Sequence, residues 1–196
     1  GAFRGENSDL IDSTIFLFLG RLDIVQKGLD ILLLSFKNLA AKHPAAHLVM
    51  AGPTDGADMN AIRELIACTG LRDRISLPGL VSGDRKWALL RDADVFVMPS
   101  RYEGLSIALL EAMASGLPVV LSDRAGLHRA VVKHGCGIVT SPTVDAVANG
   151  MTAMMSREVR ERCGRAARSL VLKSHNWAQV SLSFEKQLET CVARSR

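Results

Sequence analysis

Two glutamates between Pro99 and Pro118 provide carboxylates that could accept hydrogen bonds from hydroxyl groups. Seven residues separate Glu103 from Glu111 in the stretch PSRYEGLSIALLEAMASGLP. If both were helical, they would lie roughly 12 Å apart along the helix axis. This is too far for the paired carboxylates of a glycosidase. We therefore expect separate tasks, with Glu111 binding vicinal hydroxyls such as those of a ribose and Glu103, at a loop tip, binding a sugar.

The residues between these glutamates predict an anion site. Gly104 follows an apolar run typical of a strand, and Ser106 is a favourable residue to open a helix. The start of a helix exposes backbone N–H groups and carries a partial positive charge, and both features bind phosphate. We therefore expect the backbone from Gly104 to Ser106 to contact a phosphate group.

Two cations flank the start of another predicted helix, which begins at Gly28. Arg21 and Lys27 precede it, although a positive charge at this end interacts unfavourably with the helix dipole. An anion between them would explain their presence. A diphosphate fits, because a guanidinium binds two oxygens at once and an ammonium adds a mobile charge. Either residue taken alone is more often an ordinary surface charge.

The elements that must position these residues alternate along the chain. Short apolar runs predict strands at Thr14–Leu19, His47–Ala51, Arg74–Leu77, Asp94–Met98, Pro118–Leu121 and Gly137–Val139. Helical periodicity marks Gly28–Lys42, Asp58–Thr69, Gly83–Asp92, Ser106–Ser115, Leu127–His134, Val144–Met155, Arg157–Lys173 and Trp177–Ala193. The alternation predicts an α/β fold, a Rossmann-like parallel sheet of about six strands with helices on both faces. No linker interrupts it, so residues 1–196 are predicted to form a single domain.

The predicted strands end in loops that favour a ligand cleft. In open α/β sheets, ligands bind beyond the carboxyl ends of the strands. The first five strands leave through Gly20-Arg21, Gly52-Pro53-Thr54, Pro78-Gly79-Leu80, the segment from Pro99 to Gly104, and the segment from Ser122 to Gly126. Any one loop of this kind needs glycine and proline for its turn, but five at one edge favour a binding site.

Composition excludes several classes of function. The 196 residues are 48% hydrophobic and 22% charged, with a net charge of +4, which suits a globular domain with an anionic ligand. Basic residues are dispersed among acidic ones, so no nucleic-acid partner is expected. The apolar runs are too short to cross a bilayer. The four cysteines form no C-x-x-C pair, so we expect buried thiols in a reducing compartment and no metal site.

Together these residues resemble the retaining GT-B glycosyltransferases of family GT4, the glycosyl transferases group 1. The resemblance runs from about Ile15 to the helix after Trp177 and implies that the chain is one half of a GT-B fold. Its most specific part is the E-x7-E motif from Glu103 to Glu111, continued by AMASGLPVV. Three further segments share this resemblance. Gly20-Arg21 with Lys27-Gly28 is similar to the family's diphosphate-binding pair, and Gly79-Leu80-Val81 is similar to its base-reading loop. His175-Asn-Trp177 is similar to the start of its final helix.

The resemblance implies a role for each of these residues. The catalytic residues are Glu103, Arg21 and Lys27, of which the two cations neutralise the diphosphate and the departing nucleoside diphosphate. Glu111 binds the ribose, and Glu103 holds the donor sugar. The other donor-binding residues are Gly20, Leu80, Val81, Gly104, Leu105 and Ser106. The implied reaction transfers a sugar from a nucleoside-diphosphate sugar to a glycan or lipid-linked acceptor with retained configuration, and it needs no metal or other cofactor.

The chain departs from the family in one loop and lacks half of a GT-B enzyme. After the fifth strand the family usually has Gly-Gly and then Glu, whereas this chain has Ala125-Gly126 and Arg129. Arg129 gives the hypothesis of an acidic sugar or acceptor. The chain holds one Rossmann unit, with residues 174–196 as a predicted crossover helix toward its own N-terminal acceptor domain. Alone, it is expected to bind donor weakly and to turn over little.

The same sequence bears on two other functions and on two locations in the cell. A dinucleotide-binding oxidoreductase needs G-x-G-x-x-G after the first strand, which Gly20-Arg-Leu-Asp-Ile-Val does not supply. A non-catalytic nucleotide-sugar-binding or interaction domain that has lost turnover stays an alternative. The predicted location is cytoplasmic, with peripheral contact at the inner face of a membrane as a variant. The basic residues of Arg157–Lys173 are diluted by Glu158 and Glu161, which favours a solvated helix.

Overall fold

The computed structural model describes residues 1–53 and 56–194, without the side chains of residues 9, 56–58, 193 and 194. Thr54, in the second predicted loop, therefore lies outside the described residues. The same holds for residues 195 and 196 at the end of the predicted domain.

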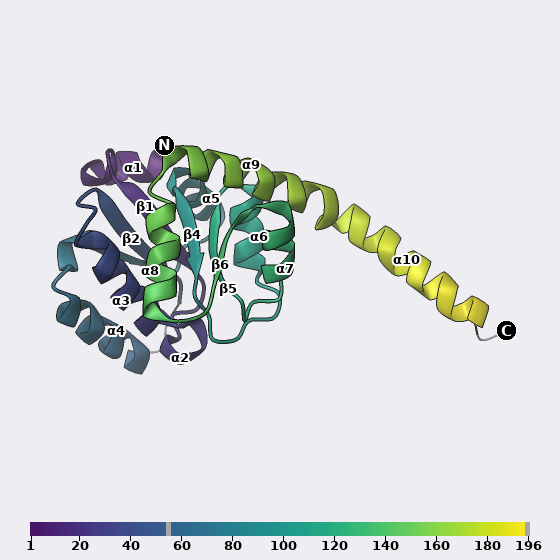
Figure 1. Ribbon diagram of the computed structural model, residues 1–196, viewed down its shortest axis with the longest axis horizontal. Coiled ribbons are helices and arrows are strands. Elements are labelled where there is room, and N and C mark those ends of the chain that lie inside the picture. The colour runs from purple at the N-terminus through teal and green to yellow at the C-terminus, as the bar shows by residue number, and fades with distance from the viewer. Residues whose placement is uncertain (54–55, 195–196) are drawn as a thin grey trace.

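Six parallel strands form one sheet at the centre of the molecule (Figure 1). They are β1 (Thr14–Leu19), β2 (Ala46–Ala51), β3 (Ile75–Gly79), β4 (Val95–Met98), β5 (Val119–Ser122) and β6 (Gly137–Thr140). Their spatial order is β3-β2-β1-β4-β5-β6. The predicted fold class is confirmed. The largest difference in strand bounds is at β3, which ends at Gly79 instead of Leu77.

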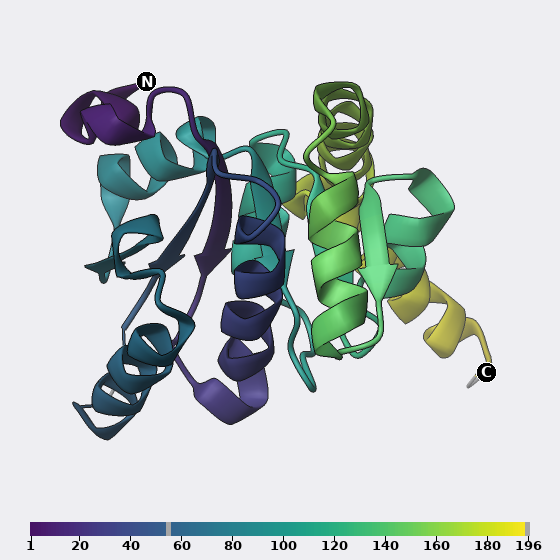
Figure 2. The same ribbon diagram turned by 60° about the vertical axis from the view of Figure 1, so that its left-hand side comes forward.

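Helices cover both faces of the sheet (Figure 2). Successive strand residues point to opposite faces, so Leu17 packs with one set of helices and Phe16 with the other. The first set is α1 (Ala2–Glu6), α5 (Gly83–Asp92), α6 (Ile107–Ala114), α7 (His128–His134) and α9 (Arg157–Ser174). The second set is α3 (Leu29–Ala40), α4 (Gly56–Thr69) and α8 (Val144–Ala153). Remaining helices are α2 (Ile24–Lys27), α10 (Trp177–Arg194) and two 3₁₀ turns, Ser8–Leu10 and Arg72–Arg74.

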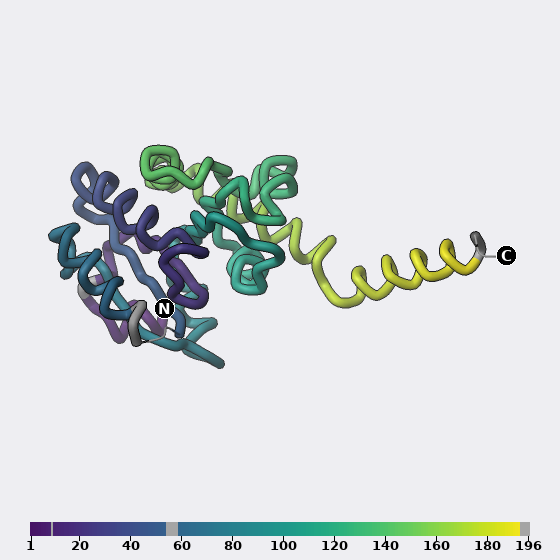
Figure 3. The backbone as a smooth tube through the Cα atoms, turned by 90° about the horizontal axis from the view of Figure 1, so that it is seen from below, coloured from purple at the N-terminus to yellow at the C-terminus, as the bar shows by residue number. Residues whose placement is uncertain are grey.

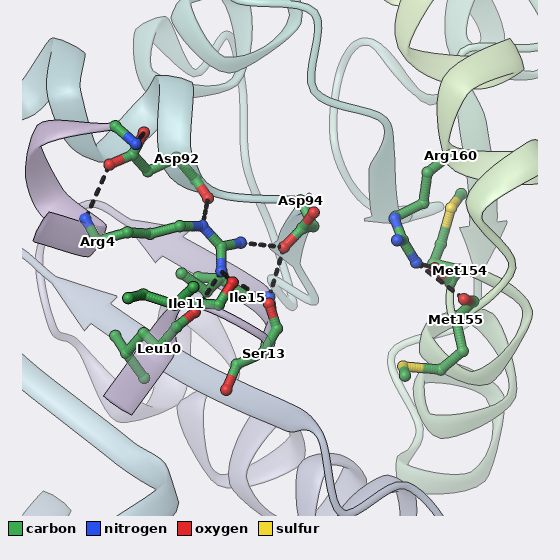
Figure 4. A network of polar contacts seen from close by, with 11 residues as sticks. Arg4, Leu10, Ile11, Ser13, Ile15, Asp92, Asp94, Met154, Met155 and Arg160 are labelled. Carbon is green, nitrogen blue, oxygen red and sulfur yellow. Dashed lines mark hydrogen bonds and ion pairs between the residues drawn. The ribbon is translucent and has the colours of Figure 1, made fainter. Parts of the chain in front are cut away.

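The short helix α1 is held by Arg4. The Arg4 guanidinium contacts the Asp94 carboxylate at 2.6 Å and donates to the carbonyl oxygens of Asp92 at 3.0 Å and Ser13 at 2.9 Å (Figure 4). Asp94 also accepts from the backbone N–H of Ile15 at 2.8 Å. These contacts tie the segment before β1 to the amino ends of β1 and β4.

Helix α9 packs against several elements of the second half of the domain. Its buried side includes Cys163, Ala167 and Leu170. Arg160 donates to the carbonyl oxygens of Met154 and Met155, both at 2.8 Å, just beyond the end of α8 (Figure 4). Arg168 donates to the Ala114 carbonyl oxygen at 2.8 Å, at the end of α6. Two of the basic residues expected on a solvated face therefore cap the ends of neighbouring helices.

The final helix, α10, projects from the body of the domain as an arm (Figures 1 and 3). Its large apolar side chains are exposed, among them Trp177 at 85% and Phe184 at 60%. Within the described residues, no helix has both the length and the apolar character that crossing a membrane requires.

The four cysteines differ in burial. Cys136 and Cys163 are buried, as predicted, whereas Cys68 and Cys191 are exposed. The prediction of four buried thiols is therefore wrong for Cys68 and Cys191. Both lie on helices, α4 and α10, that leave one or more faces open to solvent.

Candidate functional site

The loops after β1 and β4 meet at the carboxyl edge of the sheet. The two strands are neighbours, with Phe16 opposite Val95 and Leu17 opposite Phe96. From β1 the chain continues to β2 on one side, and from β4 it continues to β5 on the other. This is the point where the strand order reverses, and sheets of this strand order bind their ligands in a crevice there.

Lys27 lies on a helix that the sequence did not predict. Helix α2 begins after Asp23, whose carboxylate accepts from the Gln26 N–H at 2.7 Å, and it ends at Gly28 with φ 65°. Gly28 then starts α3. Lys27 therefore occupies the last turn of α2, where a cation interacts favourably with the helix dipole. Lys27 also directly precedes Gly28, the N-cap of α3, so its expected position before that helix is confirmed. Its place at the end of α2 was not predicted.

Arg21 lies over the outside of α2. Its side chain is 60% exposed, and its guanidinium contacts the Gln26 side-chain oxygen at 2.8 Å and the Asp23 carboxylate at 3.3 Å. The contacts found for Arg21 and Lys27 are thus to different carboxylates. Because the Arg21 side chain is mostly in solvent, it can leave these partners at little cost.

The Lys27 ammonium contacts the Glu103 carboxylate across the crevice. These side chains are only 15% and 12% exposed, so the pair is largely shielded from solvent. The sequence placed both residues in one site but did not predict that they pair with each other. Glu103 was expected at a loop tip, and the structure adds that Lys27 and the neighbouring loop largely cover its side chain.

The backbone around Glu103 is joined to the loop after β5. Glu103 forms an isolated parallel bridge with Ala125, and its N–H donates to the Arg124 carbonyl oxygen at 3.2 Å. The Gly126 N–H donates to the carbonyl oxygens of Glu103 and Gly104 at 3.0 and 3.1 Å. A Cβ on Gly126 would lie 2.5 Å from the Gly104 oxygen, so glycine is needed there for the close approach.

The start of α6 has the predicted form. Ser106 is its N-cap and accepts from the Leu109 N–H at 3.2 Å through its hydroxyl. Gly104 and Leu105 are exposed. Among the hydrogen bonds of the described residues, none uses the backbone N–H of Gly104, Leu105 or Ser106. These N–H groups are therefore available to a ligand at this edge.

Glu111 contacts a lysine that the sequence did not single out. The Lys86 ammonium, on α5, lies 2.6 Å from Glu111 Oε1, and the two side chains are 24% and 23% exposed. Lys86 also lies 4.9 Å from the centroid of the Trp87 ring. A sequence signal existed, because α5 follows the predicted base-reading loop and connects β3 to β4. This connection brings α5 beside α6 on the same face of the sheet.

The loop after β3 contributes one exposed and one buried residue. Leu80 is 70% exposed at the edge of the sheet, whereas Val81 is 6% exposed and belongs to the core. Gly20, at the end of β1, lies against the neighbouring loop: its N–H donates to the Ala51 oxygen at 3.0 Å, and a Cβ on Gly52 would lie 1.8 Å from the Gly20 oxygen. Arg129 is exposed near the start of α7.

Two further features of the described residues bear on the site, namely potential metal ligands and a hollow. These residues include no group of three or more His, Cys, Asp or Glu that could hold a metal ion. A hollow of about 450 Å³ lies near the opposite, amino edge of the sheet, beside Asp94, Pro118 and Arg160. It lies at the other edge of the sheet from Lys27, and Arg160 is occupied by carbonyl oxygens there.

This sheet, with its E-x7-E segment at the carboxyl edge, also matches known proteins. Residues 5–170 match the profile of the family described as Glycosyl transferases group 1. The chain belongs to this family. The group 1 membership confirms the resemblance inferred from Glu103 to Glu111 and the surrounding motifs, and it assigns the domain to the GT-B type.

Three similar proteins illustrate the match. An uncharacterised glycosyltransferase of Methanocaldococcus jannaschii is 35% identical over 173 residues, which are 87% of this chain and 43% of that protein. The sucrose-phosphate synthase of Thermosynechococcus elongatus superposes with a TM-score of 0.84 at 26% identity, covering 97% of this chain and 48% of that one. HepE of Anabaena, solved with UDP-glucose, superposes with a TM-score of 0.83 at 18% identity over 96% and 52% of the two chains. The group 1 chain described here therefore spans about half of the length of its relatives or less.

Proposed function

We propose that this chain is the donor-binding half of a retaining, metal-independent glycosyltransferase that uses a nucleoside-diphosphate sugar. The observation that carries the proposal is the presence of two lysine–glutamate pairs, Lys27 with Glu103 and Lys86 with Glu111, at the ligand-binding edge of the sheet. Each pair places a lysine beside a carboxylate that can accept from hydroxyl groups, and the Lys27 ammonium can also bind phosphate oxygens. A nucleoside-diphosphate sugar presents the matching groups in order: ribose hydroxyls, two phosphates and sugar hydroxyls.

Lys27 and Arg21 bind the diphosphate in this proposal. Lys27 turns from Glu103 to the phosphate oxygens, while Arg21 leaves Asp23 and Gln26 at the surface. The N–H groups from Gly104 to Ser106, before α6, add donors for the β-phosphate. When the bond between sugar and phosphate breaks, negative charge grows on the departing nucleoside diphosphate. These fixed cations and dipoles stabilise that charge in place of a metal ion.

Glu111 and Glu103 bind the two sugars of the donor. Lys86 occupies Oε1 of Glu111, which leaves Oε2 to accept from the ribose hydroxyls. Glu103 accepts from hydroxyls of the transferred sugar once Lys27 has turned to the phosphates. Gly20 and the backbone at Leu80 and Val81 complete the donor site, with the base next to the loop after β3.

The N-terminal domain of the same enzyme is the proposed partner. The chain covers 43% of the length of its relative from Methanocaldococcus jannaschii, so another part of similar size is expected. Exposed apolar side chains surround the crevice at Val25, Leu80, Tyr102, Leu105 and Ile107, and a second domain would cover them. Helix α10 is proposed as the crossover toward that domain, which binds a glycan or lipid-linked acceptor. The proposed location is the cytoplasm, with peripheral membrane contact when the acceptor is a lipid.

Calorimetric titration of UDP, GDP and ADP into the 196-residue chain tests donor binding. We expect at least one of them to bind, and Lys27→Ala to weaken it about 10-fold or more, which corresponds to ~1.4 kcal/mol. Glu111→Gln should also weaken it, because the ribose loses a charged acceptor. Lys37→Ala, on the exposed side of α3, is the control and should leave Kd unchanged.

The alternative is a domain that has kept the fold and lost turnover. If none of the three diphosphates binds to the correctly folded chain, the donor-binding proposal is wrong and an interaction domain is favoured. If a diphosphate binds but the complete two-domain enzyme does not transfer or hydrolyse any donor sugar, the domain is a non-catalytic binding module. The isolated chain itself should show little turnover in either case, because the opposite wall of the cleft is supplied by the other domain.

A further inference from the structure

One side chain of the crevice, Arg101, makes contacts that neither the diphosphate site nor the ribose site explains. It lies two residues before Glu103, and its guanidinium binds both carboxylate oxygens of Asp30, at 2.8 Å from Nη1 and 2.6 Å from Nη2. Asp30 is in the first turn of α3. Such a two-point contact fixes the orientation of both groups as well as their distance.

Arg101 also holds the end of α2. Its guanidinium donates to the carbonyl oxygens of Ile24 at 3.4 Å and Val25 at 3.0 Å, and its backbone N–H donates to the Gln26 oxygen at 2.9 Å. Helix α2 has only four residues, too few to be stable without tertiary contacts. Arg101 therefore satisfies the carbonyl groups of the helix that carries Lys27.

The backbones on the two sides of this contact touch directly. Gly28, next to Lys27, lies so close to the strand exit that a Cβ on it would be 2.5 Å from the Pro99 carbonyl oxygen. Several contacts thus connect the segment from Pro99 to Glu103 with the segment from Lys27 to Asp30. Any movement of one segment is transmitted to the other.

We propose that Asp30 and Arg101 are positioning residues, which keep α2 and the loop after β4 at a fixed separation so that Lys27 and Glu103 flank the sugar-phosphate bond. This inference rests on the proposed donor site. The pair between Lys27 and Glu103 cannot do this itself, because both groups turn to the donor when it binds. The contact between Asp30 and Arg101 remains in place in the bound state. The guanidinium also lowers the pKa of the Asp30 carboxyl, so the contact keeps its charges at neutral pH.

A second ion pair provides a matched control at the opposite edge of the sheet. Arg4 and Asp94 are also 2.6 Å apart and partly buried, and Arg4 likewise donates to several carbonyl oxygens (Figure 4). Loss of this pair loosens the domain without touching the crevice. It therefore separates an effect on position from a general loss of stability.

The experiment uses inorganic pyrophosphate and whichever of UDP, GDP and ADP the wild type binds most tightly. Calorimetry measures the binding of each to the full 196-residue chain, and the melting temperature is recorded for each variant. Arg101→Lys keeps the charge but cannot form the two-point contact. Asp30→Asn removes the carboxylate and leaves the carbonyl contacts, and it carries the test if Arg101→Lys does not fold. We expect each to weaken both ligands about 10-fold, because the displaced group is Lys27 at the diphosphate. Arg4→Lys and Asp94→Asn should lower the melting temperature and leave both affinities within twofold.

Each outcome decides between the two proposals. If the wild-type chain binds no nucleoside diphosphate, the donor site is wrong and the positioning role is wrong with it. If the wild type binds but Arg101→Lys and Asp30→Asn bind equally well, only the positioning role is wrong. The same follows if the Arg4 and Asp94 variants lose as much affinity as the crevice variants. Glu111→Gln should weaken the nucleoside diphosphate but keep pyrophosphate affinity, which separates the ribose end from the positioned diphosphate end.

Discussion

Each glutamate of the E-x7-E segment contacts a lysine from another element. Glu103 contacts Lys27, on the short helix after β1, and Glu111 contacts Lys86, on the helix after β3. Both pairs are more than three-quarters shielded from solvent on the basis of their exposures. Each lysine fixes the orientation of its carboxylate before a ligand arrives. In the proposed donor site, Lys86 orients Glu111 toward the ribose hydroxyls, and Lys27 binds the phosphates.

Removal of the Lys86 charge tests the ribose end. We expect Lys86→Met to weaken binding of the nucleoside diphosphate that the wild type binds about 5- to 10-fold, or ~1 kcal/mol, because Glu111 loses its orienting partner. Pyrophosphate binding should not change, since it has no ribose. The neighbouring exposed Arg85 provides the control through Arg85→Met. Equal losses in the two variants would mean that the general positive charge of α5 matters rather than the contact with Glu111.

The buried thiols should differ from the exposed ones in reactivity. Burial, and secondarily the nearby Cys163, raises the pKa of Cys136 to about 11, so the reactive thiolate is scarce at neutral pH. We expect iodoacetamide to modify Cys68 and Cys191 in the native chain and to leave Cys136 unmodified, as read by mass spectrometry. All four should react in urea. Rapid native labelling of Cys136 would contradict its placement in the core.

Acid should weaken the contact between Asp30 and Arg101. The folded-state pKa of Asp30 lies below its ordinary value of 3.8 because Arg101 donates to the carboxylate. Its contribution to stability is therefore present above pH 3.8 and is lost as the pH falls through the folded-state value. We expect the wild type to unfold at a higher urea concentration than Asp30→Asn at pH 7, and the difference to shrink near pH 3. A difference that grows on acidification would contradict the assigned contact.

At the scale of elements, the sequence predicted the regular parts and missed the parts that depend on distant residues. The bounds predicted for β1 match the structure, because its apolar run is buried on both faces and independent of loops. Helix α2 was missed, since its four residues are stabilised by the Asp23 cap and by Arg101, far along the chain. Helix α1 was missed for the same reason, because Arg4 binds Asp92 and Asp94.

The same distinction holds for the site. The E-x7-E spacing and Ser106 are local signals, and they correctly predicted a helix start after Gly104. The contact of Lys86 with Glu111 spans 25 residues and depends on how α5 and α6 pack. No local pattern separates Lys86 from a solvated lysine such as those on other exposed helix faces. The packing of α5 beside α6, once known, identifies Lys86 as the partner of Glu111.

The crossing of α9 over the end of α6 predicts a sensitive glycine. A Cβ on Gly164 would lie 2.2 Å from the Gly116 carbonyl oxygen, so Gly164→Ala must push the two elements apart. We expect a loss of about 1–3 kcal/mol in the free energy of unfolding. Gly5→Ala, also in a helix but with no atom within 4 Å of the new Cβ, is the control. An unchanged urea midpoint for Gly164→Ala would mean that α9 does not pack this closely.

At the scale of the whole molecule, α9 belongs to the body and α10 does not. Helix α9 buries Cys163, Ala167 and Leu170 against the sheet layer. The side chains from Trp177 to Val192 are exposed along α10. The stability of the body should therefore not depend on α10.

A chain ending at Ser174 tests this division. We expect its melting temperature to stay within about 2 °C of that of the full chain, as for changes confined to a surface. Its UDP affinity should also be unchanged. A chain ending at Ser156, which removes α9 as well, should fail to fold cooperatively because the apolar layer over β5 and β6 is uncovered. A large loss on removal of α10 alone would show that the arm packs on the body in solution.

The strand order also bears on how a preference for a different nucleotide evolves in this fold. In the proposed donor site, the diphosphate, which all nucleoside-diphosphate sugars share, lies at the middle of the sheet, where the loops after β1 and β4 are in contact. The base, which differs among donors, is assigned to the loop after β3, an outermost strand. Exchange of that peripheral loop leaves the fastening between Asp30 and Arg101 intact. After gene duplication, substitutions in the loop after β3 are therefore enough to change which nucleotide the protein binds, while the diphosphate site stays unchanged.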